Sequence, residues 1–516
     1  MMGVRAPWSG AMLLLGLAVL TAAGCLRPRG EIYSELQWSR RVSYARWRDE
    51  ADPDDCLVRV DGDLSVEEAV RLALEHNPTL QSTMLEREKA RGRLYTARAD
   101  GLPQVRVEAG YTRLDEGALV NTATGARGPR DNYSYQVNVT QPLYKGGAIA
   151  AGLDAARYYQ LLSDEVVRQA VQDVAYQTVS TYYEVVLAEK LLQVQTEALE
   201  FAQANLRDVT AREERGVAIP FDRLRARVEV ANVEAQVIQE RNRLNRARTA
   251  LMRLMGVSQK SEVAYVSDLT YVPVNADFET TVRTALLHRP ELYRSELTIL
   301  MQRAALEMAM SAYLPSLEAW GIFKRGRPDP HDSSRNDWAG QWQGGLRLAW
   351  TLFDGLRREG EVIQQRATVR QSLIDLADAE QHVFEEIKNA LFDLTDADAM
   401  VRSQEFNLEL AAEALRLVAI GVREGVNTEL EVLDARSALT TAQGNYYQAL
   451  HAHLQARHTL QRVVGLLAPE PGMTAVPDEV PPVEVLRRLE PLPASDEDGR
   501  VLYAEPVYAL PVREDR

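Results

Sequence analysis

The sequence contains the same set of landmarks twice, in the same order. The copies lie 209 or 212 residues apart and pair 75–78 with 287–290, 102–103 with 314–315, 142–146 with 351–355, 215–216 with 424–425, and 255–256 with 464–465. Each of these landmarks contains a glycine or a proline. These two residues are the strongest local signals for the ends of helices and strands. Ordered landmarks at near-constant spacing indicate a tandem duplication, so one structural unit must be built twice.

Each copy is predicted to begin with a helix that is followed by two strands. The helix begins at Asn77-Pro78 or Arg289-Pro290 and runs for about 20 residues toward a Leu-Pro pair. Apolar and polar residues then alternate along 105–112 and 133–140, and again along 317–323 and 346–352. This alternation predicts strands with two unlike faces, and ~10 residues is the length that a tilted transmembrane strand needs.

Very long helices are predicted after the strands. Residues 148–215 contain no proline and only Gly152, and residues 361–420 contain neither proline nor glycine. At about 1.5 Å per residue, such helices extend roughly 90–100 Å. Turns are expected at Gly216 and Gly425, followed by shorter returning helices over 221–255 and 429–464 that each end at a C′ glycine.

The predicted fold class is mainly α with a small β part, a tandem repeat of β-hairpins and very long α-helical hairpins. The first repeat is expected over 64–256 and the second over 277–465, with a linker over 257–276. Residues 25–63 are expected to form an N-terminal periplasmic extension. The stretch 466–516 is rich in Pro, Asp and Glu and predicts an extended or disordered acidic tail.

The N-terminus carries an export signal. Arg5 precedes an apolar run over 11–20, and Ala22-Ala23-Gly24-Cys25 follows, which predicts a signal peptide over 1–24. The small residues before Cys25 resemble the bacterial lipobox, so Cys25 is predicted to become the acylated first residue of the mature protein. The alternative is an ordinary signal peptide with a chance cysteine. Acylation of Cys25 leaves Cys56 as the one remaining thiol, which rules out an intrachain disulfide.

Composition and motifs argue against several classes of protein. The formal net charge of −15 disfavours binding to nucleic acid, which needs a basic surface. No motif of a metalloprotease, serine hydrolase or P-loop enzyme is present, so neither an enzyme nor a cofactor is expected. His451, His453 and His458 fall on one predicted helix, where a metal site competes with a solvated helix face, and the solvated face is favoured.

No stretch beyond the signal approaches the ~18 apolar residues of a transmembrane helix, so any membrane crossing must use strands. Four strands cannot close a barrel, and unpaired backbone groups at an open sheet edge cost several kcal/mol each in lipid. The chain is therefore expected to form an oligomer.

Over about residues 64–466 the sequence resembles the TolC-like outer-membrane efflux proteins. The resemblance lies in 64–69, Asn77-Pro78, Leu102-Pro103, 352–355 and 433–435. It implies a homotrimer with a twelve-stranded β-barrel on an α-helical tunnel, placed in the outer membrane and extending into the periplasm. It also implies docking with a periplasmic adaptor and an inner-membrane transporter. Within this family, the lipobox points to the lipoprotein branch that serves resistance–nodulation–division pumps. The expected cargo is small molecules, such as drugs or metals, or proteins.

The candidate site lies at the second helical tip. Glu431 and Asp434 are three residues apart and share a helix face, and the resemblance implies an acidic pair that lines the periplasmic constriction of the pore. The competing interpretation is that both acids stabilise the start of a helix. The first copy has Asp222 and Arg225 at the matching positions, so the second hairpin is expected to be the inner one. Val422 and Asn427 stand where the resemblance places a tip latch, and Asp222 is the candidate latch acceptor.

A periplasmic coiled-coil spacer or adhesin without channel activity is the alternative function. Such a protein would not need alternating strands at matching places in both copies.

Overall fold

The computed structural model describes residues 29–49, 58–115, 129–331, 335–466, 494–495 and 501–502. The chain divides into two compact units, 1–58 and 59–516, and the described part of the first unit contains helix α2 (Arg29–Asp49). Cys25 and Cys56, the predicted signal peptide and nearly all of the acidic tail lie outside the described residues. The predicted domain bounds therefore stay predictions.

The helices of the second unit come in two matching sets. The first copy has α3 (Val66–His76), α4 (Pro78–Ala99), α5 (Ala148–Glu214) and α6 (Pro220–Met255), and the second has α7 (Phe278–His288), α8 (Pro290–Met310), α9 (Arg357–Arg423) and α10 (Glu429–Val464). Both long helices have 67 residues and both returning helices have 36. The tandem repeat and the predicted fold class are thereby confirmed.

Local chemistry begins and ends these helices at the predicted corners. Asn77 accepts a hydrogen bond from the backbone N–H of Leu80 at 2.9 Å and donates its side-chain amide to the carbonyl of Leu254 at 2.7 Å. Pro78 then occupies the first helical turn, where a missing N–H costs nothing. At their C-terminal ends, α6 and α10 each stop at a left-handed glycine, Gly256 and Gly465.

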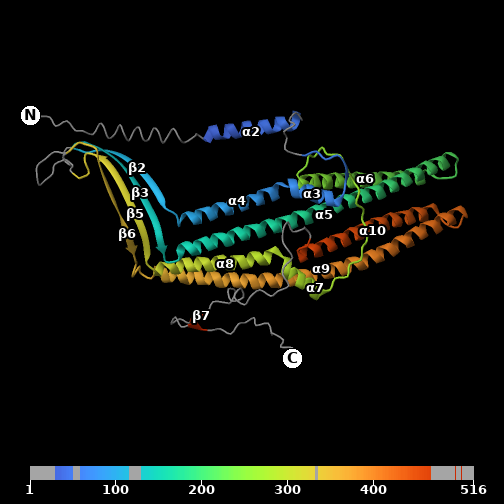
Figure 1. Cartoon of the computed structure of the whole chain (residues 1–516). Helices are drawn as coiled ribbons and strands as arrows, with labels where there is room; N and C mark the ends of the chain where they lie inside the picture. The colour runs from blue at the N-terminus through green and yellow to red at the C-terminus, as the bar shows by residue number, and fades with distance from the viewer. Residues whose placement is uncertain are drawn as a thin grey trace, which may run out of the picture. The chain divides into compact units, whose positions relative to one another are not determined.

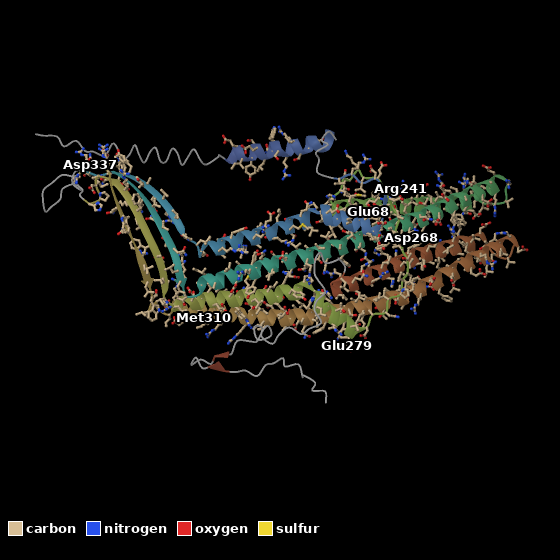
Figure 2. The ribbon with its side chains drawn as sticks, in the orientation of Figure 1. Glu68, Arg241, Asp268, Glu279, Met310 and Asp337 are labelled. Carbon is tan, nitrogen blue, oxygen red and sulfur yellow. The ribbon has the colours of Figure 1, made fainter. Side chains whose placement is uncertain are left out.

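Four antiparallel strands form one sheet in the order β2-β3-β5-β6. They are β2 (Gln104–Arg113), β3 (Asp131–Lys145), β5 (Ser316–Arg327) and β6 (Ala339–Ala349). Figure 1 shows this sheet at one end of the second unit and the turns of both long hairpins at the opposite end. In Figure 2, Met310 marks the end of the sheet that joins the helices, and Asp337 marks the distant end.

The sheet has an apolar face and a polar face, as the alternation predicts. Cross-strand pairs such as Val107 with Val137, and Phe323 with Trp342, place apolar side chains on one face. The other face carries polar pairs, in which Gln136 donates to Glu108 at 2.9 Å and Arg347 donates to Glu318 at 2.9 Å. Strands β2 and β6 are the edges of the sheet.

The predicted strand over 346–352 is wrong at its C-terminal end. Strand β6 stops at Ala349, because other groups bind the backbone and side chains that follow. The indole N–H of Trp350 donates to the carbonyl of Tyr313, and the carbonyls of Thr351 and Leu352 accept from Arg358. The chain turns there into α9.

The second unit also contains short helices and strands that were not predicted from the sequence. Helices α3 and α7 precede the predicted helix starts, and β1 (Gly62–Leu64) pairs in parallel with β4 (Val263–Tyr265). The buried Tyr182 hydroxyl donates to the carbonyl of Leu64 and accepts from the N–H of Ser267. This one side chain therefore ties β1 and the residues after β4 to the long helix α5.

Among the described residues, no helix combines the length and the apolar character needed to span a bilayer.

Candidate functional site: the two hairpin tips

The two hairpin tips use the same turn. Gly216 and Gly425 both have φ of 76°, a backbone conformation that favours glycine because it has no Cβ. Val217 donates its N–H to the carbonyl of Arg212, and Val426 donates to that of Gly421, so both turns close over the last helical carbonyls in the same way. The duplication thus extends to the backbone of the tips.

Glu431 is held in a capping box at the start of α10. Its Oε2 accepts the N–H of Thr428 at 2.8 Å and the side-chain amide of Asn427 at 2.8 Å, while the Thr428 hydroxyl accepts the N–H of Glu431. The Thr428 N–H, followed by the Asn427 amide, lowers the pKa of the Glu431 carboxyl from its ordinary value. The carboxylate therefore stays ionised at neutral pH and remains exposed.

Asp434 lies one turn further along α10 and borders the same surface. Its spacing from Glu431 places both carboxylates on one helix face. The structure thus brings the two predicted residues together on one side of the second tip. Whether that surface lines a pore stays a prediction.

Asp222 occupies in the first tip the position of Glu431 in the second. Its Oδ2 accepts the N–H of Ile219 at 3.4 Å, which is again a contact to the start of its own helix. Asn427, at a predicted latch position, is engaged by Glu431 within its own tip. The other latch position, Val422, offers a carbonyl that accepts the N–H of Gly425. Each of these hydrogen bonds therefore joins residues of the same hairpin.

The two tips differ in charge. The first turns of α6 carry Arg223, Arg225 and Arg227 beside Asp222, whereas α10 begins with Glu429 and Glu431 and continues to Asp434. The first turns of the returning helix therefore carry mainly basic side chains in the first copy, although Arg223 pairs with Glu213 at 2.9 Å, and acidic side chains in the second. We call the two ends the basic tip and the acidic tip.

An ion pair that the sequence did not reveal joins the two hairpins. Arg212 on α5 lies 2.8 Å from Asp208 on its own helix and 2.8 Å from Glu429 on α10. Further from the tips, the guanidinium of Arg436 on α10 lies 5.3 Å from the centre of the Phe201 ring on α5. The repeat could have pointed to the pair, because Arg212 matches Gly421 and Glu429 matches Pro220, so neither partner is required by the shared fold.

The histidines of α10 do not form a solvated face, so the favoured expectation is wrong. His453 is fully buried, with Nδ1 2.9 Å from Asp398 and Nε2 3.0 Å from the carbonyl of Val272. His458 stacks on Tyr183, and His451 contacts Gln455. Their packing against α5, α9 and the inter-repeat linker explains their position. Within the described residues, no group of three or more metal-ligating side chains occurs.

A cavity of about 580 Å³ lies away from the tips. It sits between α6 and β4 and is lined by Asn245, Arg248, Thr249 and Gln259 among others. These side chains can bind polar groups but form no nucleophile–base pair of the kind used in covalent catalysis.

Burial of His451 predicts a pH-dependent stability. Burial, with a further contribution from Arg243, lowers the pKa of His451 to about 4. An unfolded chain binds this proton near pH 6.5 and the folded chain only near pH 4, so stability is full above about 6.5 and falls as the pH drops through this window. The loss is up to about 3 kcal/mol per chain. Thermal melting followed by circular dichroism from pH 7.5 to 4.5 measures it.

The matched variants are His451→Gln and, as a control, His331→Gln in the β5–β6 loop, where the imidazole is exposed. We expect His451→Gln to reduce the pH dependence, with the remainder due in part to His458, whose pKa is also lowered by burial, and His331→Gln to preserve it. An unchanged slope in His451→Gln would show that other groups govern acid stability.

Comparison with known proteins agrees with the fold described above. The family described as "Outer membrane efflux protein" matches residues 69–257 and 281–466. The chain is 25% identical over 423 residues to the alkaline protease secretion protein AprF of Pseudomonas aeruginosa, covering 78% of this chain and 85% of that protein. It is 24% identical over 419 residues to the cobalt-zinc-cadmium resistance protein CzcC of Cupriavidus metallidurans, covering 78% and 90%.

A solved structure shares the same fold. The Campylobacter jejuni CmeC outer membrane channel superposes with a TM-score of 0.70 at 17% identity, covering 84% of this chain and 90% of that one. The family match and the named relatives define an outer-membrane exit duct and not an enzyme. The chain belongs to the outer membrane efflux protein family.

Proposed function

We propose that three copies of the chain close one duct. The observation that supports this is the four-stranded sheet, whose edges β2 and β6 have no partner strand within the described part of the chain. Edge strands expose unpaired backbone groups, which lipid does not tolerate, so β6 of one copy pairs with β2 of the next. Three copies supply twelve strands and six helical hairpins around one axis.

The partners proposed for this duct are a periplasmic adaptor and an inner-membrane transporter that delivers small molecules or proteins. The tips support this proposal because they expose apolar side chains that a monomer does not need in water. Val217 is 77% exposed, Phe221 65% and Val426 82%. Apolar side chains gathered at the ends of helical hairpins fit a helical protein partner better than solvent.

Glu431 and Asp434 are proposed to set the cation affinity of the periplasmic mouth. Both lie on one face of the acidic tip, and threefold assembly gathers six carboxylates around the axis. Capping does not compete with this role, because the hydrogen bonds to Thr428 and Asn427 both use Oε2 of Glu431 and keep the carboxylate ionised. Crowded carboxylates attract multivalent cations strongly.

Single-channel recording tests the proposal with conservative variants. The double change Glu431→Gln and Asp434→Asn keeps hydrogen-bond acceptors but removes the charges. We expect block by a trivalent cobalt hexammine ion, added from the tip side, to weaken at least tenfold, since about 1.4 kcal/mol corresponds to tenfold in affinity.

Asp222→Asn is the matched control, because it removes the corresponding carboxylate from the basic tip. We expect its block to equal that of the parent. If the double variant is blocked as tightly as the parent, the two acids serve only the helix start. If the parent protein does not conduct, the spacer function replaces the duct.

A further inference from the structure

Helix α2 (Arg29–Asp49) presents large apolar side chains to solvent. Tyr33 is 64% exposed, Leu36 54% and Tyr44 60%, and Ile32 is exposed as well. A helix of 21 residues in water is normally stabilised by packing an apolar face against something. We therefore expect the exposed apolar side chains of α2 to pack against another surface.

The exposed apolar residues share one face. At 100° per residue, Ile32, Tyr33, Leu36 and Tyr44 project within one side of the helix, together with Arg40. Ser43 lies on the same side, and its hydroxyl donates to the carbonyl of Ser39 at 3.0 Å. That hydroxyl is thus satisfied within the helix and does not need water.

The charged residues are also divided between the two sides of the helix. Glu31 and Glu35 project from the side opposite the apolar face, while Arg40 lies within the apolar face and Arg41 flanks it. The helix sequence contains five Arg and three acidic residues, although the whole chain has a net charge of −15. Trp38 and Val42 are exceptions to the pattern, since both project on the acidic side.

We propose that α2 lies along the surface of a phospholipid bilayer, with Tyr33, Leu36 and Tyr44 at the boundary between headgroups and acyl chains. Tyrosine and arginine suit this boundary, because the ring or alkyl stem enters the apolar layer while the hydroxyl or guanidinium contacts lipid phosphate. The charge pattern favours this occupant over an apolar protein groove, since the basic side faces the anionic phosphates and the acidic side faces water.

The position of the helix in the sequence agrees with this surface. Arg29 lies four residues after Cys25, and four residues span at most about 14 Å. An acyl group on Cys25 would therefore hold the start of α2 next to the bilayer. The inference rests on the proposed outer-membrane duct and adds a non-covalent attachment to the predicted acyl group.

Spin labels placed on the two sides of α2 test the inference in the full-length protein. Cys56→Ser removes the other thiol, and mass spectrometry of the mature N-terminus establishes that Cys25 is acylated and blocked. Single cysteines then replace Tyr33, Leu36, Glu31 or Glu35 in protein reconstituted into vesicles of phosphatidylethanolamine and phosphatidylglycerol. Accessibility to lipid-soluble oxygen and to a water-soluble nickel chelate is measured by power saturation.

We expect labels at 33 and 36 to favour oxygen severalfold over labels at 31 and 35. Equal access of the nickel chelate to all four positions would overturn the inference, as would protection of 33 and 36 from both reagents, which would indicate packing on protein, including a second copy of this chain. Conductance of the same vesicles separates the bilayer contact from the duct. Conducting vesicles with water-exposed labels refute only the bilayer contact, whereas non-conducting vesicles refute the duct.

Discussion

Replacing Gly256 with alanine is expected to destabilise the fold by about 3 kcal/mol or more per chain. Gly256 ends α6 with φ of 68°, and a methyl group there would lie 2.7 Å from the carbonyl carbon of His76 and closer still to its oxygen. The strain of the left-handed backbone adds to a steric overlap with a backbone group that cannot rotate away. The midpoint of thermal unfolding in detergent, followed by circular dichroism, measures the loss.

Gly216→Ala is the matched control, because Gly216 has φ of 76° and no atom within 4 Å of the added methyl group. It should lose only the backbone contribution, about 1–2 kcal/mol. Equal losses in the two variants would mean that α6 and α3 can move apart to accommodate the methyl group at little cost in stability. A methyl group added at Gly465 would lie 3.0 Å from the carbonyl oxygen of His288, so a close approach of the same kind recurs in the second copy.

Replacing Arg358 with leucine is expected to cost about 3–5 kcal/mol, because its removal leaves buried acceptors without partners. The buried guanidinium donates to the carbonyls of Ala312, Thr351 and Leu352 and lies 2.9 Å from the Asp354 carboxylate. It also lies 5.0 Å from the centre of the Tyr313 ring. This one side chain joins the end of the sheet to the start of α9.

Arg357→Leu provides the control at the neighbouring position. The Arg357 side chain is 78% exposed and pairs with Glu361 at 3.0 Å, a surface contact worth less than about 1 kcal/mol. Hydrogen exchange at the first turns of α9 should therefore accelerate strongly in Arg358→Leu and little in Arg357→Leu. Similar exchange in both variants would contradict the joining role of Arg358.

The long elements could be predicted from sequence because their signals are local. Asn77-Pro78 fixes a helix start through a cap and a proline, and the uninterrupted stretch before Arg215-Gly216 fixes a helix of 67 residues. The strands could also be predicted, because the two faces of the sheet meet different environments and apolar and polar residues therefore alternate along each strand. The duplication strengthened every one of these predictions, since each signal appears twice.

The remaining features depend on contacts between distant residues, which periodicity does not encode. The burial of His453 requires Asp398 and Val272 to meet it from another helix and from the linker. The end of β6 depends on Arg358, which lies beyond the strand. At the tip, sequence found Glu431 and Asp434 but missed Arg212, whose partner Glu429 lies in the other copy.

The equal lengths of the paired helices place a joint constraint on how this chain can change. Helices α5 and α9 have 67 residues each and α6 and α10 have 36 each, so both tips end at matching positions in their copies. Each residue inserted into only one long helix would advance its tip by about 1.5 Å relative to the other. Changes in the reach of the hairpins must therefore come in pairs, one in each copy, whereas the charge of either tip is free to vary alone.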